Sequence, residues 1–191
     1  SPEGATAAYR VGDGATNIGA FHEGLNMAQV WKLPVIFLCQ NNLYSEHTPM
    51  SFATSSDSIK QRGEGLGLRS VQVNGNDASA MYAAAKEAVE YARAGHGPTL
   101  IEAMTFRFHG HLLGDTSHYI PKEEMEQAKK DDPMPILRQQ LLDIQVSEAD
   151  IAAIEAKNAA IIEEASQFAL DAPYPPGDEY RIDVLDVEIA A

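Results

Sequence analysis

The segment Pro34-Val-Ile-Phe-Leu-Cys-Gln40 is apolar on both faces of the strand that it would form. Such strands are typical of parallel sheets covered by helices, because a sheet with one face in water alternates apolar and polar residues. Further segments with the composition of strands lie on either side, at residues 7–11, 68–73 and 99–108. Helical periodicity occurs between them, over residues 17–30, 59–65 and 77–94. This alternation requires crossover connections and predicts an α/β fold, a doubly wound parallel sheet with helices on both faces.

The chain changes character after Gly114 and becomes predominantly helical. Short helices are predicted to begin at Pro121 and Pro133, and a long helix is predicted over residues 147–170, where Ser147 and Asp150 suggest a capping box. Its apolar stripe is expected to face inward, and consists of Ile151, Ile154, Ile161, Ala165 and Phe168. We therefore expect an α/β domain over residues 1–119 and a helical C-terminal extension with an acidic tail, residues 120–191, packed on the same domain.

The amino-acid composition argues against several classes of protein function. The 191 residues include 28 acidic and 14 basic side chains, a net charge of −14 that argues against nucleic-acid binding, which needs a basic surface. The longest apolar run covers residues 33–39, far shorter than the roughly 20 residues of a membrane span, so we expect no membrane insertion. Cys39 is the only cysteine and is expected to be a buried, unreactive thiol. Because no secretory signal pattern is evident, the default location is the cytoplasm.

Two short polar motifs follow successive predicted strands. Gly12-Asp13-Gly14 ends the first strand and Asn41-Asn42 ends the next, with 26 residues between the motifs. In a parallel sheet both ends open at the carboxyl edge, where α/β proteins bind ligands. Asp13, expected to face solvent, offers a carboxylate and Asn42 an amide oxygen, and such hard oxygens suit Mg²⁺ or Ca²⁺. A helix starting near Asn17 would direct its N-terminus at an anion, so the pattern predicts a cation and phosphate site.

Histidines offer weaker candidates. His47, beside Glu46 in a loop, can be a substrate contact or simply an exposed side chain. His109 and His111 are two residues apart, a spacing that on a strand would place them on the same side. No further cluster of Cys or His residues completes a zinc site with them.

Four stretches resemble the alpha subunit of the decarboxylating component of 2-oxoacid and acetoin dehydrogenases. They are GDGATNIGAFHEGLNMA at residues 12–28, WKLPVIF at 31–37, NNLY at 41–44 and TFRFHGH at 105–111. The resemblance implies a thiamine-diphosphate-binding fold. It also implies that Mg²⁺ is held by the Asp13 carboxylate, the Asn42 side chain and the Tyr44 backbone carbonyl. Gly14 and Ala15 would offer backbone N–H groups to the diphosphate. His111, the implied catalytic residue, would lie in a loop that closes over the cofactor and hydrogen-bond its phosphate end.

The same resemblance implies a function and partners. The expected activity is that of a thiamine-diphosphate-dependent oxidoreductase subunit, which carries out oxidative decarboxylation of a 2-oxoacid or cleavage of acetoin and transfers the acyl group to a lipoyl-bearing acyltransferase. A beta-type subunit would complete a heterotetramer of two alpha and two beta chains and supply the glutamate that activates the aminopyrimidine.

Family alpha subunits carry a long portion before the Gly-Asp-Gly motif that has no counterpart here. The alternative is therefore a truncated, non-catalytic module that binds a beta-type partner. A Mg²⁺-dependent phosphohydrolase would need a positioned nucleophile or a second carboxylate cluster, and the sequence shows neither.

Overall fold

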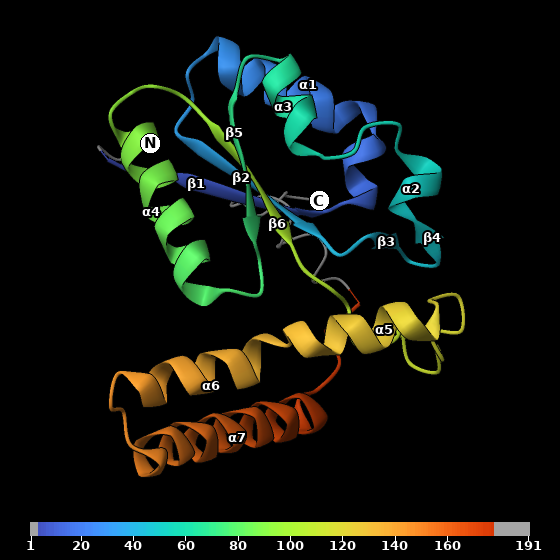
Figure 1. Ribbon diagram of the computed structural model, residues 1–191, viewed down its shortest axis with the longest axis vertical. Helices are drawn as coiled ribbons and strands as arrows, with labels where there is room; N and C mark the ends of the chain where they lie inside the picture. Colours follow the sequence, from blue (N-terminus) through green and yellow to red (C-terminus); the bar gives the residue numbers. More distant parts are fainter. Residues whose placement is uncertain (1–3, 178–191) are drawn as a thin grey trace. The chain divides into compact units, whose positions relative to one another are not determined.

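A parallel sheet forms the centre of the α/β part of the protein (Figure 1). The computed structural model describes residues 4–177. The sheet has four strands in the order β1-β2-β6-β5, and all neighbouring pairs are parallel. The strands are β1 (Ala7–Gly12), β2 (Val35–Asn41), β5 (Arg69–Asn74) and β6 (Thr99–Met104). The predicted α/β fold class and the parallel sheet are confirmed.

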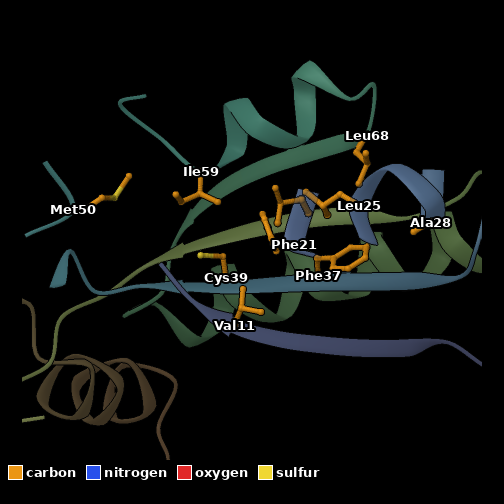
Figure 2. Packing of buried hydrophobic residues seen from close by; sticks show 10 residues of the cluster. Val11, Phe21, Leu25, Ala28, Phe37, Cys39, Met50, Ile59 and Leu68 are labelled. Atoms are coloured by element: carbon orange, nitrogen blue, oxygen red, sulfur yellow. The ribbon is translucent and has the colours of Figure 1, made fainter. Parts of the chain in front are cut away.

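Helices cover both faces of this sheet. The helices α1 (Gly19–Val30) and α3 (Lys60–Gly65) lie on one face, and α4 (Ala78–Arg93) lies on the other (Figure 1). The strand β2 needs a helix on each side because it carries apolar side chains on both faces of the sheet. Phe37 and Cys39 belong to the larger core cluster, whereas Ile36 belongs to the cluster with Ala88 of α4. Figure 2 shows the larger cluster, whose buried members are Val11, Phe21, Leu25, Ala28, Phe37, Cys39, Met50, Ile59, Leu68 and Leu100. The predicted burial of Cys39 is confirmed, and that burial raises the pKa of its thiol to about 12.

Two element boundaries differ from the sequence prediction where the site lies. Residues Gly14–Asn17 form a short 3-10 turn, η1, and the helix α1 starts only at Gly19 instead of near Asn17. The strand β6 ends at Met104 and not at Phe108, because its neighbours β2 and β5 end opposite Met104 and only the Thr105 N–H still bonds to β2, at the Asn41 carbonyl. The β2–α3 connection contains a small hairpin and one helical turn: β3 (Tyr44–Ser45), β4 (Thr48–Pro49) and α2 (Met50–Ala53).

The C-terminal part is helical, as predicted. It comprises α5 (Lys122–Ala128), the 3-10 turn η2 (Lys129–Asp131), α6 (Pro133–Asp143) and α7 (Glu148–Asp171). Ser147 caps α7, since its side chain accepts a hydrogen bond from the Asp150 N–H at 3.1 Å. The contacts divide the chain into two compact units between Gln140 and Leu141. Within residues 4–177, no helix combines the length and apolar content that crossing a membrane requires.

The expectation for the apolar stripe of α7 is largely wrong. Only Ile151 is buried, whereas the other four members are exposed: Ile154, Ile161, Ala165 and Phe168. A periodic stripe is buried only where another element packs over it, and periodicity along one helix does not specify that element. Most of the acidic tail, residues 178–191, lies outside the described residues.

Candidate functional site

The two polar motifs meet at the carboxyl edge of the sheet. Because β1 and β2 are parallel neighbours with Gly12 opposite Gln40, the residues that follow them lie side by side. The backbone N–H of Asn42 is close enough to the Asp13 carboxylate to lower the pKa of that group. The structure thus brings together two predicted ligand residues that are far apart in the sequence.

Asp13 is buried, contrary to the expectation that it faces solvent. Only 3% of the residue is exposed, because η1 and the hairpin β3–β4 enclose it. Burial raises the pKa of its carboxyl group, and the N–H groups of Asp13, Asn42 and Gly14 together with the charge of Arg107 only partly oppose this. Among the described residues, none forms an ion pair with this carboxylate. A bound cation would therefore stabilise an ionised group that the fold itself disfavours.

Gly14 lets the backbone after Asp13 pass close to the hairpin. A Cβ atom at this position would collide with the side chain of Ser45, so no larger residue fits without a shift of the backbone. Ala15 follows in η1 and is exposed. Beside Gly14 lies a cavity of about 200 Å³, lined by Asp13, Gly14, Asn17, Ser45, Thr48, Met50, Ala53 and Thr54.

The two asparagines of the second motif have different environments. Asn41 is buried and donates from Nδ2 to Oε1 of Glu102 at 2.7 Å, while its Oδ1 accepts the Leu43 N–H at 3.1 Å. Asn42 is half-buried, and its Oδ1 accepts the Tyr44 N–H at 3.1 Å. An amide oxygen has two lone pairs, so the Asn42 side chain keeps one for a cation.

The side chain of Tyr44 fixes this turn to the rest of the site. Its hydroxyl donates to Oε2 of Glu124 in α5 at 2.9 Å, and its ring contacts Phe106 and Tyr119. Burial, followed by the hydrogen bond to Glu124, raises the pKa of the phenol to about 12. The Tyr44 side chain therefore anchors the turn as a neutral group, and the ligand role implied by the resemblance concerns its backbone carbonyl.

His111 lies in the loop between β6 and α5, and so does His109. The strand β6 ends at Met104, before both residues, so the same-side placement that a strand would give them does not apply. The His111 side chain is exposed, with its Nδ1 3.2 Å from Nη1 of Arg107. Arg107 is also the charge that acts on Asp13, so it links the His111 loop to the buried carboxylate. The neighbouring Leu112 and Leu113 are 58% and 101% exposed.

Asp115 organises this loop, and sequence reasoning missed it. Its carboxylate accepts the N–H groups of His111 and Ser117 at 2.7 and 2.8 Å and the hydroxyl of Tyr119 at 2.8 Å. These donors, the His111 N–H first, lower the pKa of Asp115 to about 2. His47 Nε2 lies 3.8 Å from the same carboxylate and its ring packs on Tyr119, which places His47 in the loop network.

Arg107 also belongs to this hydrogen-bond network. It donates from Nη2 to the Tyr119 hydroxyl and to the Glu46 carbonyl, both at 2.7 Å, while its buried Nε has no partner among the described residues. Two features of the sequence could have pointed to these two residues: Arg107 lies inside the TFRFHGH stretch, and Asp115 is the first carboxylate after that stretch.

We predict that Asp115→Asn loosens residues 107–119, because an amide cannot accept all three donors of the carboxylate. Amide hydrogen exchange in this segment is expected to become about tenfold faster, the factor that corresponds to one lost net hydrogen bond. The wild-type loop should loosen in acid. Since the pKa of Asp115 falls from 3.8 to about 2 on folding, its contribution is complete above pH 4 and is lost as the pH falls toward 2. Asp131→Asn is the control outside the loop, and equal exchange in both variants would contradict the role of Asp115.

The donor set at the edge fits a magnesium ion. Asp13, Asn42 and the Tyr44 carbonyl offer only hard oxygen atoms, and Mg²⁺ is commonly held by few protein oxygens together with water and substrate phosphates. Over residues 4–177, no group of three or more His, Cys, Asp or Glu side chains is arranged to hold a metal ion. A soft-metal site of the zinc type therefore has no basis in this part of the chain.

The fold and this edge define a parallel α/β protein with an oxygen-rich, glycine-containing site at the carboxyl ends of its strands. The family model described as dehydrogenase E1 component matches residues 2–177, and the chain belongs to this family, which has a thiamine-diphosphate-binding fold.

Curated relatives agree with this assignment. The chain is 44% identical over 174 residues to the alpha subunit of acetoin:2,6-dichlorophenolindophenol oxidoreductase from Bacillus subtilis, covering 91% of this chain and 52% of that protein. It is 38% identical over 175 residues to the pyruvate dehydrogenase E1 component subunit alpha of Rickettsia felis, covering 91% and 54%. A chloroplastic pyruvate dehydrogenase E1 subunit alpha-3 from Oryza sativa is 40% identical over 179 residues, covering 92% and 42%. The chain thus spans about half the length of the curated relatives it matches.

Proposed function

We propose that the chain is the diphosphate- and Mg²⁺-binding part of an alpha subunit in a thiamine-diphosphate-dependent dehydrogenase. The observation that carries this is the buried Asp13 carboxylate, which lies beside Gly14 and the Asn42 backbone and forms no ion pair with a described residue. The reaction would be oxidative decarboxylation of a 2-oxoacid or cleavage of acetoin, with the acyl group passed to a lipoyl-bearing acyltransferase. The similarity to the acetoin and pyruvate enzymes named above supports both substrate classes.

Each site residue has a distinct task in this proposal. The Asp13 carboxylate, the Asn42 amide oxygen and the Tyr44 carbonyl hold Mg²⁺, and the backbone N–H groups of Gly14 and Ala15 bind the diphosphate. When bound, thiamine diphosphate supplies the electron sink for the carbanion formed at the substrate carbonyl. The protein supplies the charge of Asp13, the close backbone approach at Gly14 and the fixed turn that presents Asn42.

The loop with His111 covers the phosphate end of the cofactor in this proposal. The Arg107 contact and the Asp115 carboxylate hold His111 from its side chain and from its backbone, respectively. We propose that the imidazole donates to a phosphate oxygen. The exposed Leu112 and Leu113 would then pack down and exclude water from the site.

A beta-type subunit is the proposed partner, in an assembly of two alpha and two beta chains in the cytoplasm. The alternative is that the chain is a non-catalytic module that binds such a partner. Both hypotheses include the partner, and they differ in whether this chain contributes to cofactor binding.

Calorimetric titration separates the two. Thiamine diphosphate with Mg²⁺ is titrated into the chain alone, into the chain with its beta-type partner, and into the same assembly carrying His111→Ala. We expect saturable, Mg²⁺-dependent binding in the assembly and affinity about 10-fold lower with His111→Ala, since one hydrogen bond to a charged group is lost. His109→Ala, in the same loop, is the control. Assembly without Mg²⁺-dependent binding would favour the non-catalytic module.

A further inference from the structure

Glu102 is a fully buried carboxylate in the centre of the sheet, and the site described above does not use it. It lies on β6, and its two oxygens together accept four hydrogen bonds. Oε1 accepts Nδ2 of Asn41 at 2.7 Å and the Ile59 N–H at 2.9 Å. Oε2 accepts the Lys60 N–H at 3.0 Å and Nε2 of Gln72 at 3.1 Å.

These four partners require an ionised carboxylate at this position. All are N–H donors, and no described Lys, Arg or His forms an ion pair with Glu102. Burial by itself raises the pKa of Glu102, but the Ile59 and Lys60 N–H groups and the two amide side chains more than offset this, so the pKa is lowered overall. A buried ion held by neutral groups seldom adds net stability compared with a well-packed apolar side chain. A contribution to stability therefore does not explain why a carboxylate is buried at this position.

The hydrogen bond to Asn41 suggests a reason. The Nδ2 of Asn41 donates to Glu102 and to Sδ of Met50, so its Oδ1 must point the other way, where it accepts the Leu43 N–H. Leu43 has a φ of +68°, a left-handed conformation that non-glycine residues adopt only when their surroundings impose it. Its carbonyl in turn accepts the Met50 N–H at 2.7 Å. The orientation of the Asn41 amide thus holds the turn at Leu43, and the proposed ligand residues Asn42 and Tyr44 lie directly before and after Leu43.

We propose that Glu102 is a positioning residue for the cation site, acting through Asn41. By fixing which end of the Asn41 amide faces Leu43, the carboxylate holds the strained turn that presents the Asn42 side chain and the Tyr44 carbonyl. The identity of the bound ligand rests on the proposed function, whereas the hold on the turn is a property of the chain itself. The competing explanation is that Glu102 only joins β6 to β5 and to the start of α3.

The isosteric variant Glu102→Gln tests this most directly. The amide keeps the shape of the side chain but places an NH₂ group against two of the four donors. The matched control is Ile101→Val, on the same strand, because Ile101 packs on the opposite face of the sheet with Ile36 and Ala88. This control removes one methyl group from the core and leaves the contacts of Asn41 in place.

Amide hydrogen exchange on the chain is the first readout. After correction for the change in global stability, the Leu43 and Tyr44 amides are expected to exchange about tenfold faster in Glu102→Gln, the factor that corresponds to one lost net hydrogen bond. In Ile101→Val their corrected exchange rates are expected to stay the same. Asn41→Ala should cause the same acceleration, and adding Glu102→Gln to it should change these two amides less than about twofold, since both act along one path. Equal exchange in Glu102→Gln and Ile101→Val, or additive effects with Asn41→Ala, would overturn the proposal. Should Glu102→Gln fail to fold, unchanged exchange in Asn41→Ala would overturn it.

The second readout is the affinity for Mg²⁺ with thiamine diphosphate in the assembly with the beta-type partner. We expect it to fall about tenfold in Glu102→Gln, within the range known for residues that orient metal ligands, and to stay within twofold in Ile101→Val. Wild-type affinity in Glu102→Gln would refute a role at the cation site. Lack of cofactor binding by the wild-type assembly would instead refute the proposed function, and the exchange measurement would still decide whether Glu102 holds the turn.

Discussion

Asp13→Asn is expected to lower the Mg²⁺-dependent affinity for thiamine diphosphate by about 100-fold or more, because it removes the only anionic ligand of the proposed site. The same variant should be at least as stable as the wild type. Burial raises the pKa of Asp13 above its ordinary value of 3.8, so the folded protein binds this proton more tightly than the unfolded chain. The ionised group therefore destabilises the fold at neutral pH, and this penalty disappears as the pH falls below 3.8. Asparagine avoids the penalty.

Two measurements check this prediction. Calorimetric titration of the assembly gives the affinity, and thermal unfolding of the chain without cations between about pH 4 and 8 gives the stability, with the advantage of the variant expected to grow as the pH rises. Asp57→Asn is the matched control, because it makes the same charge change at an exposed loop position of the same unit. Unchanged cofactor affinity would contradict the metal assignment. A lower melting temperature at pH 7 would show that the carboxylate stabilises the fold instead.

Gly14→Ala is expected to damage both the fold and the site. The added Cβ would overlap the side chain of Ser45, and rotation of that side chain cannot relieve the overlap because the Ser45 Cβ itself is in the way. The hairpin β3–β4 must shift, which should cost about 1–3 kcal/mol, as for other overpacked positions. Since Tyr44 is in the same hairpin, its carbonyl would move and cofactor affinity should fall with stability.

A second substitution makes this prediction specific. Without the Ser45 side chain, the nearest remaining atom is the Ser45 Cα, 3.5 Å from the new methyl group, which is an ordinary contact. The double variant Gly14→Ala/Ser45→Gly should therefore recover most of the stability that Gly14→Ala loses, as measured by urea unfolding. Gly12→Ala is the control, because a Cβ there meets nothing within 4 Å and should change stability by no more than about 0.5 kcal/mol. Failure of the double variant to recover would contradict the steric explanation.

Local patterns predicted the elements of the α/β part well where the chain itself supplies the partners. The helix α4 begins where Asp77 suggested, since this side chain accepts the N–H groups of Ser79 and Ala80 at 2.9 and 3.0 Å. The apolar segment around Phe37 is the strand β2, flanked by helices on both faces. The two polar motifs could be placed at one edge because parallel strands all open in the same direction. Spacing and composition were sufficient for these features.

Boundaries were predicted less well because they depend on neighbours. A strand-like alternation of polar and aromatic residues continues past Met104 to Phe108, but β6 stops where β2 and β5 stop. The stripe along α7 has the period of a buried face, yet its members beyond Ile151 are exposed. In both cases the sequence pattern is that of a paired strand or of a buried helix face. Whether the strand is paired or the face is buried depends on a segment elsewhere in the chain.

By itself, the sequence determined the parallel α/β class, the family and the meeting of Asp13 with Asn42, since these follow from periodicity, strand direction and motif. Only the tertiary structure decided the roles of Glu102 and Asp115. Glu102 follows an apolar pair in β6, and its partner Asn41 is 61 residues away along the chain. Asp115 depends on a loop with no regular period. A buried carboxylate is defined by the donors that surround it, and those donors come from segments that approach one another only when the chain is folded.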